Sequence, residues 1–414
     1  MLYKRLIPIT ILMSIALSII DVYSPVNAAS DKGQGTNRAA QGPSWMQAFP
    51  ARPIPFMHRP YYGKRTILQR TVSYVDHDRP WYVTDGVFVR FDGERWTNVD
   101  IRSCRGGVNC YDGHNGYDLN LWFEPVLSVA AGTVIRAGWF NPLNHEGGLG
   151  LWTMIDHHNG YGTAYGHLSA LIVHVGDHVG VQWQIGTSGT SGSSRGPHLH
   201  MTTYYLPSWS ATDPFGWTGH YRDPNVVPDH YLWAGHTAAK SNVPDLSTHG
   251  RAIYPGATLV DDGGTGWSSR GRWHRSSSSS DIRGDLRWAW TTAGSSTASA
   301  TWQATLPANG YYEVGAFVDD NHASSGWAPY TIYSLDPAHN TKKKHIVLVD
   351  QEHVGSFRGP YGWVNTGPQW ISLGTYYFER STPARVVLSN ATGERGLQLA
   401  ADGVEFVPVS VQSA

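Results

Sequence analysis

The chain of 414 residues is poor in charge, since Asp, Glu, Lys and Arg make up only 15 % of it and the formal net charge is -1. No basic excess is available to neutralise phosphates, so the composition argues against a nucleic-acid partner. Cysteine is scarce as well, with two residues in the whole chain. Beyond the N-terminus no segment is apolar enough to cross a bilayer, which predicts no membrane span in the mature protein.

Glycine (46 residues), tryptophan (18) and tyrosine (22) are abundant instead. A chain of this length exceeds one ordinary core, so two or three domains are expected. Short β-prone runs alternate with Gly, Asn and Asp, and no long 3.6-residue period is present. This pattern predicts an all-β protein, with an antiparallel β-sandwich or barrel-like core followed by a second β-rich block.

The N-terminus has the pattern of a secretory signal peptide. Lys4 and Arg5 precede an apolar run from Leu6 to Ile20, and small residues end the segment at Ala28. We predict cleavage after residue 28 and a secreted protein of the cell envelope. The run is short for a bilayer span, and an uncleaved anchor is the alternative.

Composition divides the rest of the chain into four segments. Residues 29–99 are predicted to be a flexible lead-in with a small β extension, and residues 100–233 to be the first β domain. Residues 234–256 resemble a linker because they are polar and contain Pro244 and Pro255. Residues 257–408 form the second β-rich block.

Cys104 and Cys110 flank a turn-rich stretch that contains Gly106 and Gly107. An oxidising compartment favours a disulfide between them, and the glycines ease the bend that it needs. The alternative is a cysteine-containing metal site, because His114 follows closely.

Among the 20 histidines of the chain, three local arrangements within residues 100–233 stand out. His114 and Asp118 lie four residues apart around a glycine, and His167 ends a β-prone run. His198 and His200 occupy alternate positions.

The alternation of His198 and His200 is informative because side chains at i and i+2 of a strand point to one face. Both imidazoles should therefore enter one cleft, while Leu199 turns into the core. A half-exposed strand also explains such a pair taken alone, but the three arrangements together indicate a metal site.

Zinc suits this set of donors. Catalytic zinc sites use three protein ligands, and imidazoles and carboxylates are suitable donors. Two histidines and one aspartate fill that number, with one ion per domain, and zinc acidifies a bound water molecule. The two remaining histidines are then free for proton transfer and oxyanion stabilisation.

Residues 100–205 resemble the lysostaphin-type, or LytM-type, zinc endopeptidases that cut peptide bonds in bacterial peptidoglycan. The ordered matches are His114-Asn115-Gly116-Tyr117-Asp118, the run 160–169 with Tyr165-Gly166-His167, the run 185–192, and Gly196-Pro197-His198-Leu199-His200. The resemblance implies a compact antiparallel β core with a groove for an extended peptide.

Carried over position by position, the resemblance places the zinc ligands at His114, Asp118 and His200. It places the catalytic histidines at His167 and His198. Some relatives lack ligands and only activate other wall enzymes, but every position is filled here, which favours an enzyme. The alternative is a non-catalytic wall-binding or activator protein with the same fold.

The second block resembles the C-terminal module of golvesin and xanthan lyase-type proteins. The similarity rests on short runs that include Val260-Asp261-Asp262, the segment 306–314 and Ala401-Asp402-Gly403. It implies a jelly-roll-like β-sandwich accessory domain. Binding of cell-surface glycans is the function expected of it, although aromatic residues in such domains more often belong to the core.

Overall fold

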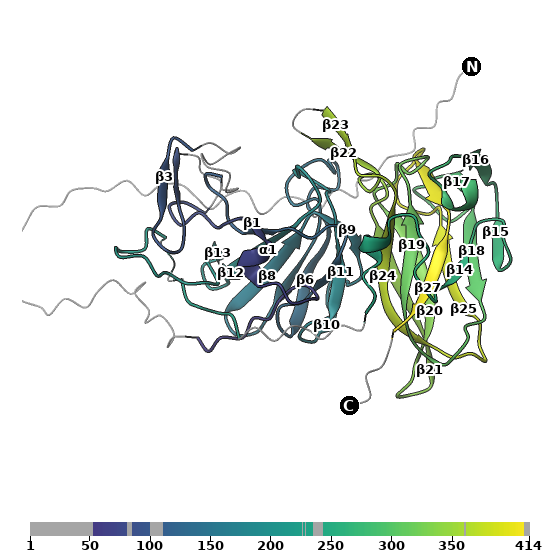
Figure 1. The fold of residues 1–414 in the computed structure, drawn as a ribbon, viewed down its shortest axis with the longest axis horizontal. Helices are drawn as coiled ribbons and strands as arrows, with labels where there is room; N and C mark the ends of the chain where they lie inside the picture. The colour runs from purple at the N-terminus through teal and green to yellow at the C-terminus, as the bar shows by residue number, and fades with distance from the viewer. Residues whose placement is uncertain are drawn as a thin grey trace, which may run out of the picture. The chain divides into compact units, whose positions relative to one another are not determined.

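The computed structural model describes residues 53–80, 85–99, 111–225, 227, 229–234, 243–359 and 362–409 (Figure 1). The predicted signal peptide and the pair Cys104 and Cys110 lie outside these residues. Antiparallel strands dominate the described residues, which confirms the all-β class. Their helical elements are α1 (Ile67–Arg70) and the 3-10 turns η1 (Leu246–His249) and η2 (Ile282–Gly284). None of the described helices is long and apolar enough to span a membrane.

The first block contains a sheet in the order β1-β4-β12-β8-β7-β6-β10, with β13 paired to β12. Its strands are β1 (Thr71–Ser73), β4 (Tyr117–Leu119), β6 (Gly132–Trp139), β7 (Leu151–Asp156), β8 (Tyr161–Gly166), β10 (His178–Val179), β12 (Leu199–Tyr205) and β13 (Ser210–Ala211). Strands β5 (Pro125–Leu127), β9 (Leu168–Leu171) and β11 (Gln184–Ser188) pair with one another beside it. A hairpin is formed by β2 (Val87–Val89) and β3 (Arg95–Thr97).

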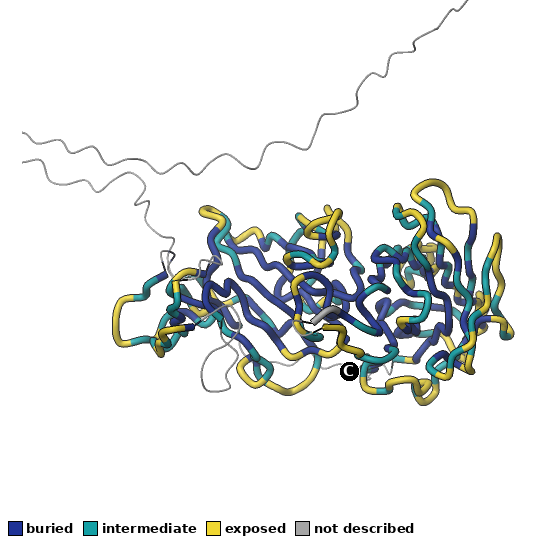
Figure 2. Tube along the Cα trace, turned by 90° about the horizontal axis from the view of Figure 1, so that it is seen from above, coloured by how far each residue is buried: buried dark blue, intermediate teal, exposed yellow. Residues whose placement is uncertain are grey.

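The two faces of strands β4 and β12 carry different kinds of residue: one carries apolar core residues and the other carries polar residues. Tyr117, Leu119 and Leu199 are fully buried members of the hydrophobic core of the first block. Asp118 and His200 occupy the alternate positions, which point to the opposite face of a strand. Figure 2 shows buried residues along much of the described chain, with exposed residues mainly where the chain bends.

Part of the segment before the first block is packed into it. Met57, Tyr61, Ile67 and Val75 are buried in the same core, and β1 pairs with β4 in antiparallel fashion. Their apolar side chains extend the hydrophobic core at the edge of the sheet where β1 pairs with β4. The chain from residue 53 to residue 80 therefore supports the strand that bears Asp118.

His77 holds this segment in place through buried carboxylates. Its Nε2 lies 3.0 Å from an oxygen of Asp213, and its Nδ1 lies 3.0 Å from oxygens of Asp223 and Asp229. Burial by itself would lower the pKa of His77, but the three carboxylates raise it well above the ordinary value. Because both ring nitrogens face carboxylates, the ring can donate two hydrogen bonds as a charged imidazolium.

The second block is a sandwich of two antiparallel sheets. One sheet has the order β14-β27-β19-β24 and the other the order β15-β18-β25-β20-β21. A single pairing of β20 with β24, Leu335 opposite Tyr377, connects the two. The strands are β14 (Thr258–Val260), β15 (Trp267–Arg270), β18 (Ser299–Ala304), β19 (Gly310–Val318), β20 (Ala328–Asp336), β21 (Thr341–Val349), β24 (Gln369–Phe378), β25 (Ala384–Ser389) and β27 (Val404–Pro408). Smaller sheets use β16 (His274–Ser277), β17 (Asp285–Trp290) and β26 (Gln398–Ala401), and β22 (Ser356–Gly359) with β23 (Gly362–Asn365).

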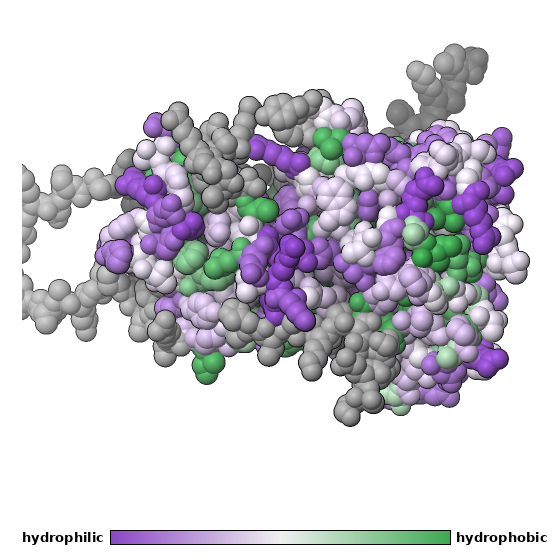
Figure 3. Space-filling model, viewed as in Figure 1, coloured by the Kyte–Doolittle hydropathy of each residue, from purple (hydrophilic) through white to green (hydrophobic). Residues whose placement is uncertain are grey.

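Side chains from both sheets fill the core of the sandwich. Val314 and Phe406 come from one sheet, and Trp302, Ile332 and Val386 come from the other. The alternation of buried and exposed residues along β18 and β25 matches a strand with one face on such a core. On the face shown in Figure 3, hydrophobic residues lie in separate patches among hydrophilic ones.

The two blocks are joined by hydrogen bonds as well as by the chain. Strand β21 pairs with β9, so that Leu348 lies opposite Leu171. Thr187 Oγ1 donates to the carbonyl oxygen of Ser372 at 2.8 Å, and Gln184 Nε2 donates to Ser372 Oγ at 2.7 Å. The sheet of the second block therefore continues into the β9-β11-β5 strands of the first.

Within the predicted linker, residues 235–242 lie outside the described part, and residues 243–256 pack on the second block. Leu246 is buried beside Phe317 and Trp370. Trp370 Nε1 donates to the carbonyl oxygen of Ala252 at 3.0 Å, and the Tyr254 amide donates to Glu405 at 3.0 Å. This segment thus covers one side of the sandwich.

We expect the stabilisation that His77 provides to disappear at high pH. Its pKa is raised in the folded protein above the unfolded value of about 6.5. The contribution is therefore complete below about pH 6.5 and is lost as the pH rises through the raised pKa. His77→Gln should lower the free energy of unfolding at about pH 6 by roughly 3 kcal/mol, because it breaks a buried ion pair.

Urea unfolding of both proteins from about pH 5 to pH 9 measures this effect. His174→Gln is the control, because His174 lies near a single carboxylate, that of Asp177, and its side chain is 51 % exposed. The wild-type protein should approach the His77→Gln protein in stability as the pH rises. A constant difference over the whole range would contradict the charged state of His77.

Candidate metal centre and active site

One row of residues across three strands forms the floor of the candidate site. Asp118 on β4 lies opposite His200 on β12, and His200 lies opposite Gly166 on β8. His167 follows directly after the end of β8, with a left-handed backbone at φ 59°. Strand pairing therefore brings together residues that are far apart in the sequence.

The carboxylate of Asp118 is the meeting point of the site. Its Oδ1 lies 2.9 Å from His200 Nδ1, 3.3 Å from His114 Nε2 and 3.5 Å from His198 Nε2. One donor atom each from His114, Asp118 and His200 lies within 4.8 Å of the other two. The side chains of His198 and Asp118 keep 16 % and 11 % exposure, so the centre is open to solvent on their side.

The imidazoles of His114 and His200 are held by partners on their outer nitrogens. His114 Nδ1 lies 2.8 Å from the carbonyl oxygen of Tyr74, so it carries the proton and leaves the lone pair of Nε2 facing the centre. His200 Nε2 lies 2.9 Å from Thr202 Oγ1, and its Nδ1 faces the centre. Such outer contacts fix the orientation of metal-binding histidines.

His167 and His198 are oriented by main-chain carbonyls. His167 Nδ1 donates to the carbonyl oxygen of Ser191 at 2.7 Å, and His198 Nδ1 donates to that of Gly196 at 2.7 Å. Their ring centroids are 4.7 Å apart. Both rings therefore keep Nε2 available for a reacting group beside the centre.

Burial and neighbouring charges shift the pKa values of Asp118, His167 and His198 in different directions. Burial alone would raise the pKa of Asp118, but the imidazoles of His114 and His198 hold it well below its ordinary value. Burial, followed by the neighbouring His198 and His200, lowers the pKa of His167 well below its ordinary value. Burial would lower the pKa of His198 too, but Asp118 raises it. Asp118 is thus ionised and His167 neutral at neutral pH.

These residues fit a zinc ion. Two neutral imidazole nitrogens and one ionised carboxylate are a catalytic zinc donor set, and the fourth position is left for another molecule. The three residues are buried, with relative exposures of 0 % for His114, 8 % for Asp118 and 1 % for His200. A desolvated carboxylate next to two oriented imidazoles is well suited to a divalent ion.

Gly116 permits the close approach of His200. A Cβ atom on Gly116 would lie 2.7 Å from His200 Nε2 and 2.7 Å from the carbonyl oxygen of Met201. Any side chain there would push His200 away from Asp118. Steric exclusion of a side chain therefore explains why a glycine stands between His114 and Asp118.

The segment before the site supplies further supports that no local sequence pattern indicates. Ser73 Oγ lies 3.2 Å from His114 Nδ1, beside the carbonyl of Tyr74. The carboxylate of Asp76 accepts hydrogen bonds from the amides of Gly113 and Val89 at 2.8 and 3.0 Å. The contacts with His114 and Gly113 span about 40 residues and have no local pattern, so only pairing of β1 with β4 reveals them.

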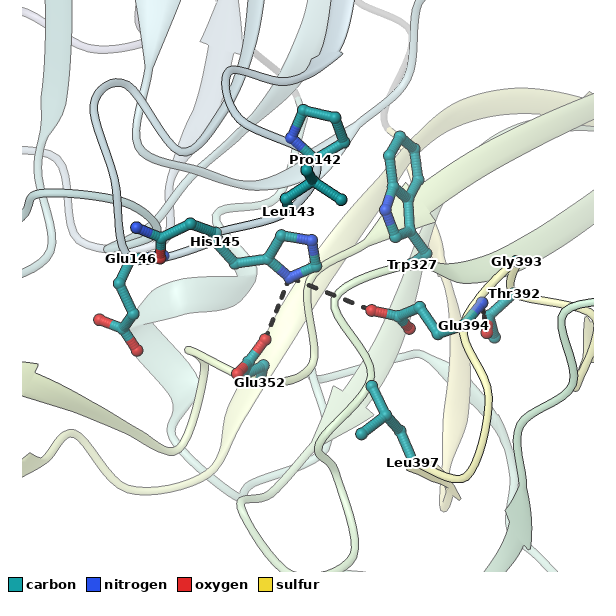
Figure 4. Close-up of a pocket in the computed structure, with 11 residues that line it drawn as sticks. Pro142, Leu143, His145, Glu146, Trp327, Glu352, Thr392, Gly393, Glu394 and Leu397 are labelled. Atoms are coloured by element: carbon teal, nitrogen blue, oxygen red, sulfur yellow. Dashed lines mark hydrogen bonds and ion pairs between the residues drawn. The ribbon is translucent and has the colours of Figure 1, made fainter. Parts of the chain in front are cut away.

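A pocket of about 700 Å³ lies between the loop 142–146 of the first block and the second block (Figure 4). His145 sits between Glu352 and Glu394 there, with its Nδ1 3.2 and 4.0 Å from their carboxylates. None of the predicted site residues lines this pocket. The carbonyl of His145 accepts the Gly192 amide at 2.9 Å, so the loop touches the segment that orients His167.

Comparison with known families identifies two domains in the chain. Residues 112–214 match Peptidase family M23, and residues 258–408 match the Golvesin C-terminal domain. The chain carries a peptidase family M23 domain. Both resemblances expected from the sequence are therefore confirmed. The M23 domain contains all five predicted site residues, and a relative from Buchnera aphidicola that aligns with 22 % of this chain is named an uncharacterized metalloprotease.

Characterised relatives align with the M23 domain. Peptidoglycan DD-endopeptidase ShyA of Vibrio cholerae is 32 % identical over 142 residues, which cover 34 % of this chain and 29 % of ShyA. Glycyl-glycine endopeptidase ALE-1 of Staphylococcus capitis is 34 % identical over 113 residues, 26 % of this chain and 29 % of ALE-1. The chain thus spans less than a third of the length of these relatives.

Among solved structures, the catalytic domain of lysostaphin from Staphylococcus simulans is 31 % identical. The match covers 28 % of this chain and 85 % of that domain, with a TM-score of 0.23. A zinc-containing peptidase from Vibrio cholerae is 22 % identical and covers 31 % of this chain and 44 % of its own, also with a TM-score of 0.23.

Gly116→Ala should lower the metal content of the M23 domain, because the new Cβ would displace His200. Gly196→Ala is the matched control, since a Cβ there would have no neighbour within 4 Å and the carbonyl that orients His198 is kept. Elemental analysis after purification measures zinc per chain in both variants. Full zinc occupancy in the folded Gly116→Ala protein would refute the steric role of Gly116.

Proposed function

We propose that the protein is a zinc-dependent endopeptidase that hydrolyses peptide bonds in bacterial peptidoglycan outside the cytoplasm. The observation that carries the proposal is the convergence of His114, Asp118 and His200 on one centre, with His167 and His198 beside it. The names of the relatives ShyA and ALE-1 support the substrate class, which comprises stem peptides or cross-bridges.

The ion is proposed to be held by His114 Nε2, one oxygen of Asp118 and His200 Nδ1. When bound, zinc supplies Lewis-acid polarisation and makes a water molecule acidic enough to act as a nucleophile near neutral pH. The Tyr74 carbonyl keeps the imidazole of His114 in the required tautomer, and the contact with Thr202 orients the imidazole of His200.

His167 and His198 are proposed to perform the proton chemistry. Neutral His167 presents Nε2 as a proton acceptor, because its Nδ1 proton is engaged by the carbonyl of Ser191. His198, which Asp118 holds more readily protonated, presents an N–H that can stabilise negative charge on the scissile carbonyl oxygen or protonate the leaving amine. The two roles follow from the different environments of two neighbouring imidazoles.

The Golvesin C-terminal domain is proposed to bind cell-surface glycans and so to locate the enzyme on its substrate. Trp290, Tyr311 and Trp363 are exposed, by 50 %, 43 % and 72 %. Exposed aromatic rings offer apolar faces on which sugar rings can stack. Binding to an insoluble wall would raise the effective concentration of the peptide bonds near the M23 domain.

The competing hypothesis is a non-catalytic wall-binding or activator protein that retains the M23 fold. Such a protein has no need for two further histidines oriented next to a metal centre. Here both are present and held by main-chain carbonyls. The arrangement therefore favours the enzyme.

His167→Ala and His198→Ala should each lower turnover on purified cell walls by about 10²-fold or more, because general acid–base groups contribute that much. Zinc should remain bound in both, since neither residue is a proposed ligand. Turbidity loss of cell-wall suspensions measures turnover, and elemental analysis measures zinc. His174→Ala, which removes a half-exposed histidine, is the control and should be fully active.

A wild-type protein that is zinc-loaded and folded but leaves cell walls and soluble wall peptides intact would instead establish the non-catalytic alternative. Ordinary turnover in the His167→Ala protein would remove that residue from the mechanism. Loss of zinc from either variant would show a ligand role and overturn the assignment of the metal set.

A further inference from the structure

Three buried aspartates meet inside the Golvesin C-terminal domain. Asp261 and Asp262 follow β14, and Asp402 lies between β26 and β27. One carboxylate oxygen from each lies within 4.8 Å of the other two. The three residues are only 6 %, 4 % and 3 % exposed. Asp281, the residue before η2, is 3 % exposed and adds the charge of a fourth carboxylate to the surroundings of Asp402.

Several of these oxygens have no hydrogen-bond donor among the described residues. They are the Oδ1 atoms of Asp261, Asp262 and Asp402. The Oδ2 atom of Asp262 accepts no hydrogen bond either, but it forms an ion pair with Arg287 Nε at 3.2 Å. The remaining oxygen of Asp402 accepts the amide of Ile282 at 3.0 Å. Most buried side-chain oxygen atoms in proteins have at least one hydrogen-bond partner, so this concentration of unfilled acceptors points to a bound cation.

Two arginines neutralise only part of the charge. Arg287 Nε lies 3.2 Å from Asp262, but its guanidinium is also 3.7 Å from Asp285. Arg283 Nε is 3.8 Å from Asp261, and its side chain is 64 % exposed, so water screens it. The cluster therefore keeps an excess of buried negative charge.

The three carboxylates lie within 4.8 Å of one another and have too few hydrogen-bond donors. Like charges this close repel one another, and a divalent cation or shared protons would relieve the repulsion.

We propose that Asp261, Asp262 and Asp402 bind one calcium ion. An oxygen-only donor set suits calcium, whereas zinc prefers nitrogen and sulfur. Calcium–oxygen distances of about 2.3–2.6 Å allow two ligands of one ion to lie up to about 5 Å apart, which the oxygen separation of at most 4.8 Å satisfies. The ion ties the end of β14 to the β26–β27 turn, and through Ile282 to η2.

The test uses the full-length, zinc-loaded protein in calcium-free buffer. The melting temperature should rise with the concentration of calcium chloride, because a ligand of the folded state stabilises it by mass action. Terbium should bind in place of calcium and emit on tryptophan excitation, since Trp302 Nε1 donates to the Asp402 carbonyl at 2.7 Å. Calcium should then displace terbium and quench the emission.

Asp262→Asn is the decisive variant, because it removes one charge and keeps the shape of the side chain. It should be more stable than wild type without calcium, since repulsion is relieved, and should bind calcium at least about tenfold more weakly. Asp336→Asn is the control, because Asp336, at the end of β20, pairs with His339 in the loop that follows and with Lys343 on β21. It should keep the full response to calcium.

A melting temperature that does not respond to calcium, with the Asp262→Asn protein more stable throughout, would overturn the proposal in favour of shared protons. Equal stabilisation by magnesium at the same concentration would overturn the choice of calcium. If the Asp262→Asn protein does not fold, competition between terbium and calcium in wild type still decides, because no calcium-sensitive emission would refute the site.

Discussion

The buried carboxylate of Asp118 is the constraint on which the candidate site depends. Its Oδ1 lies within 3.5 Å of nitrogens from His114, His198 and His200. An ionised group in such a place is tolerable only when its neighbours are positive or when a cation is bound. The side-chain positions therefore follow from strand register: Asp118 faces the site because Tyr117 and Leu119 face the core. A register slip of one residue would reverse both.

Strand alternation made much of this predictable from the sequence. The pair His198 and His200 around a core-facing Leu199 follows the two-residue period of a strand. His114 and Asp118 lie only four residues apart around a glycine, which is also a local pattern. The supports of His114 had no such signal, because Tyr74 lies 40 residues before it and contributes only a main-chain carbonyl. The contact between His77 and Asp213 had no local signal either, since the two residues lie 136 positions apart in the sequence. Contacts of this kind depend on the tertiary fold and not on the residue types nearby.

The second block illustrates the same limit. Its β-sandwich class follows from alternating strands such as β18 and β25, and the comparison with the Golvesin C-terminal domain agrees. The sequences of β21 and β9 do not predict that these strands pair, because an edge strand of almost any sequence can accept a partner. The meeting of Asp261 with Asp402 was hidden for the same reason, although each residue was already noticed in a separate short run. Only the order of the strands in the sheet shows which polar residues far apart in the chain lie together in one site.

The order of the site residues along the chain has a consequence for biosynthesis. His114 and Asp118 are made first, and His200, which pairs with Asp118, is made 82 residues later than Asp118. Strand β12 also lies between β4 and β8 in the sheet, so the sheet remains in two pieces until that strand arrives. A chain that emerges from the ribosome N-terminus first therefore has an incomplete centre for most of the synthesis of this domain. A chain that stops before β12 lacks His200 and therefore has no complete centre.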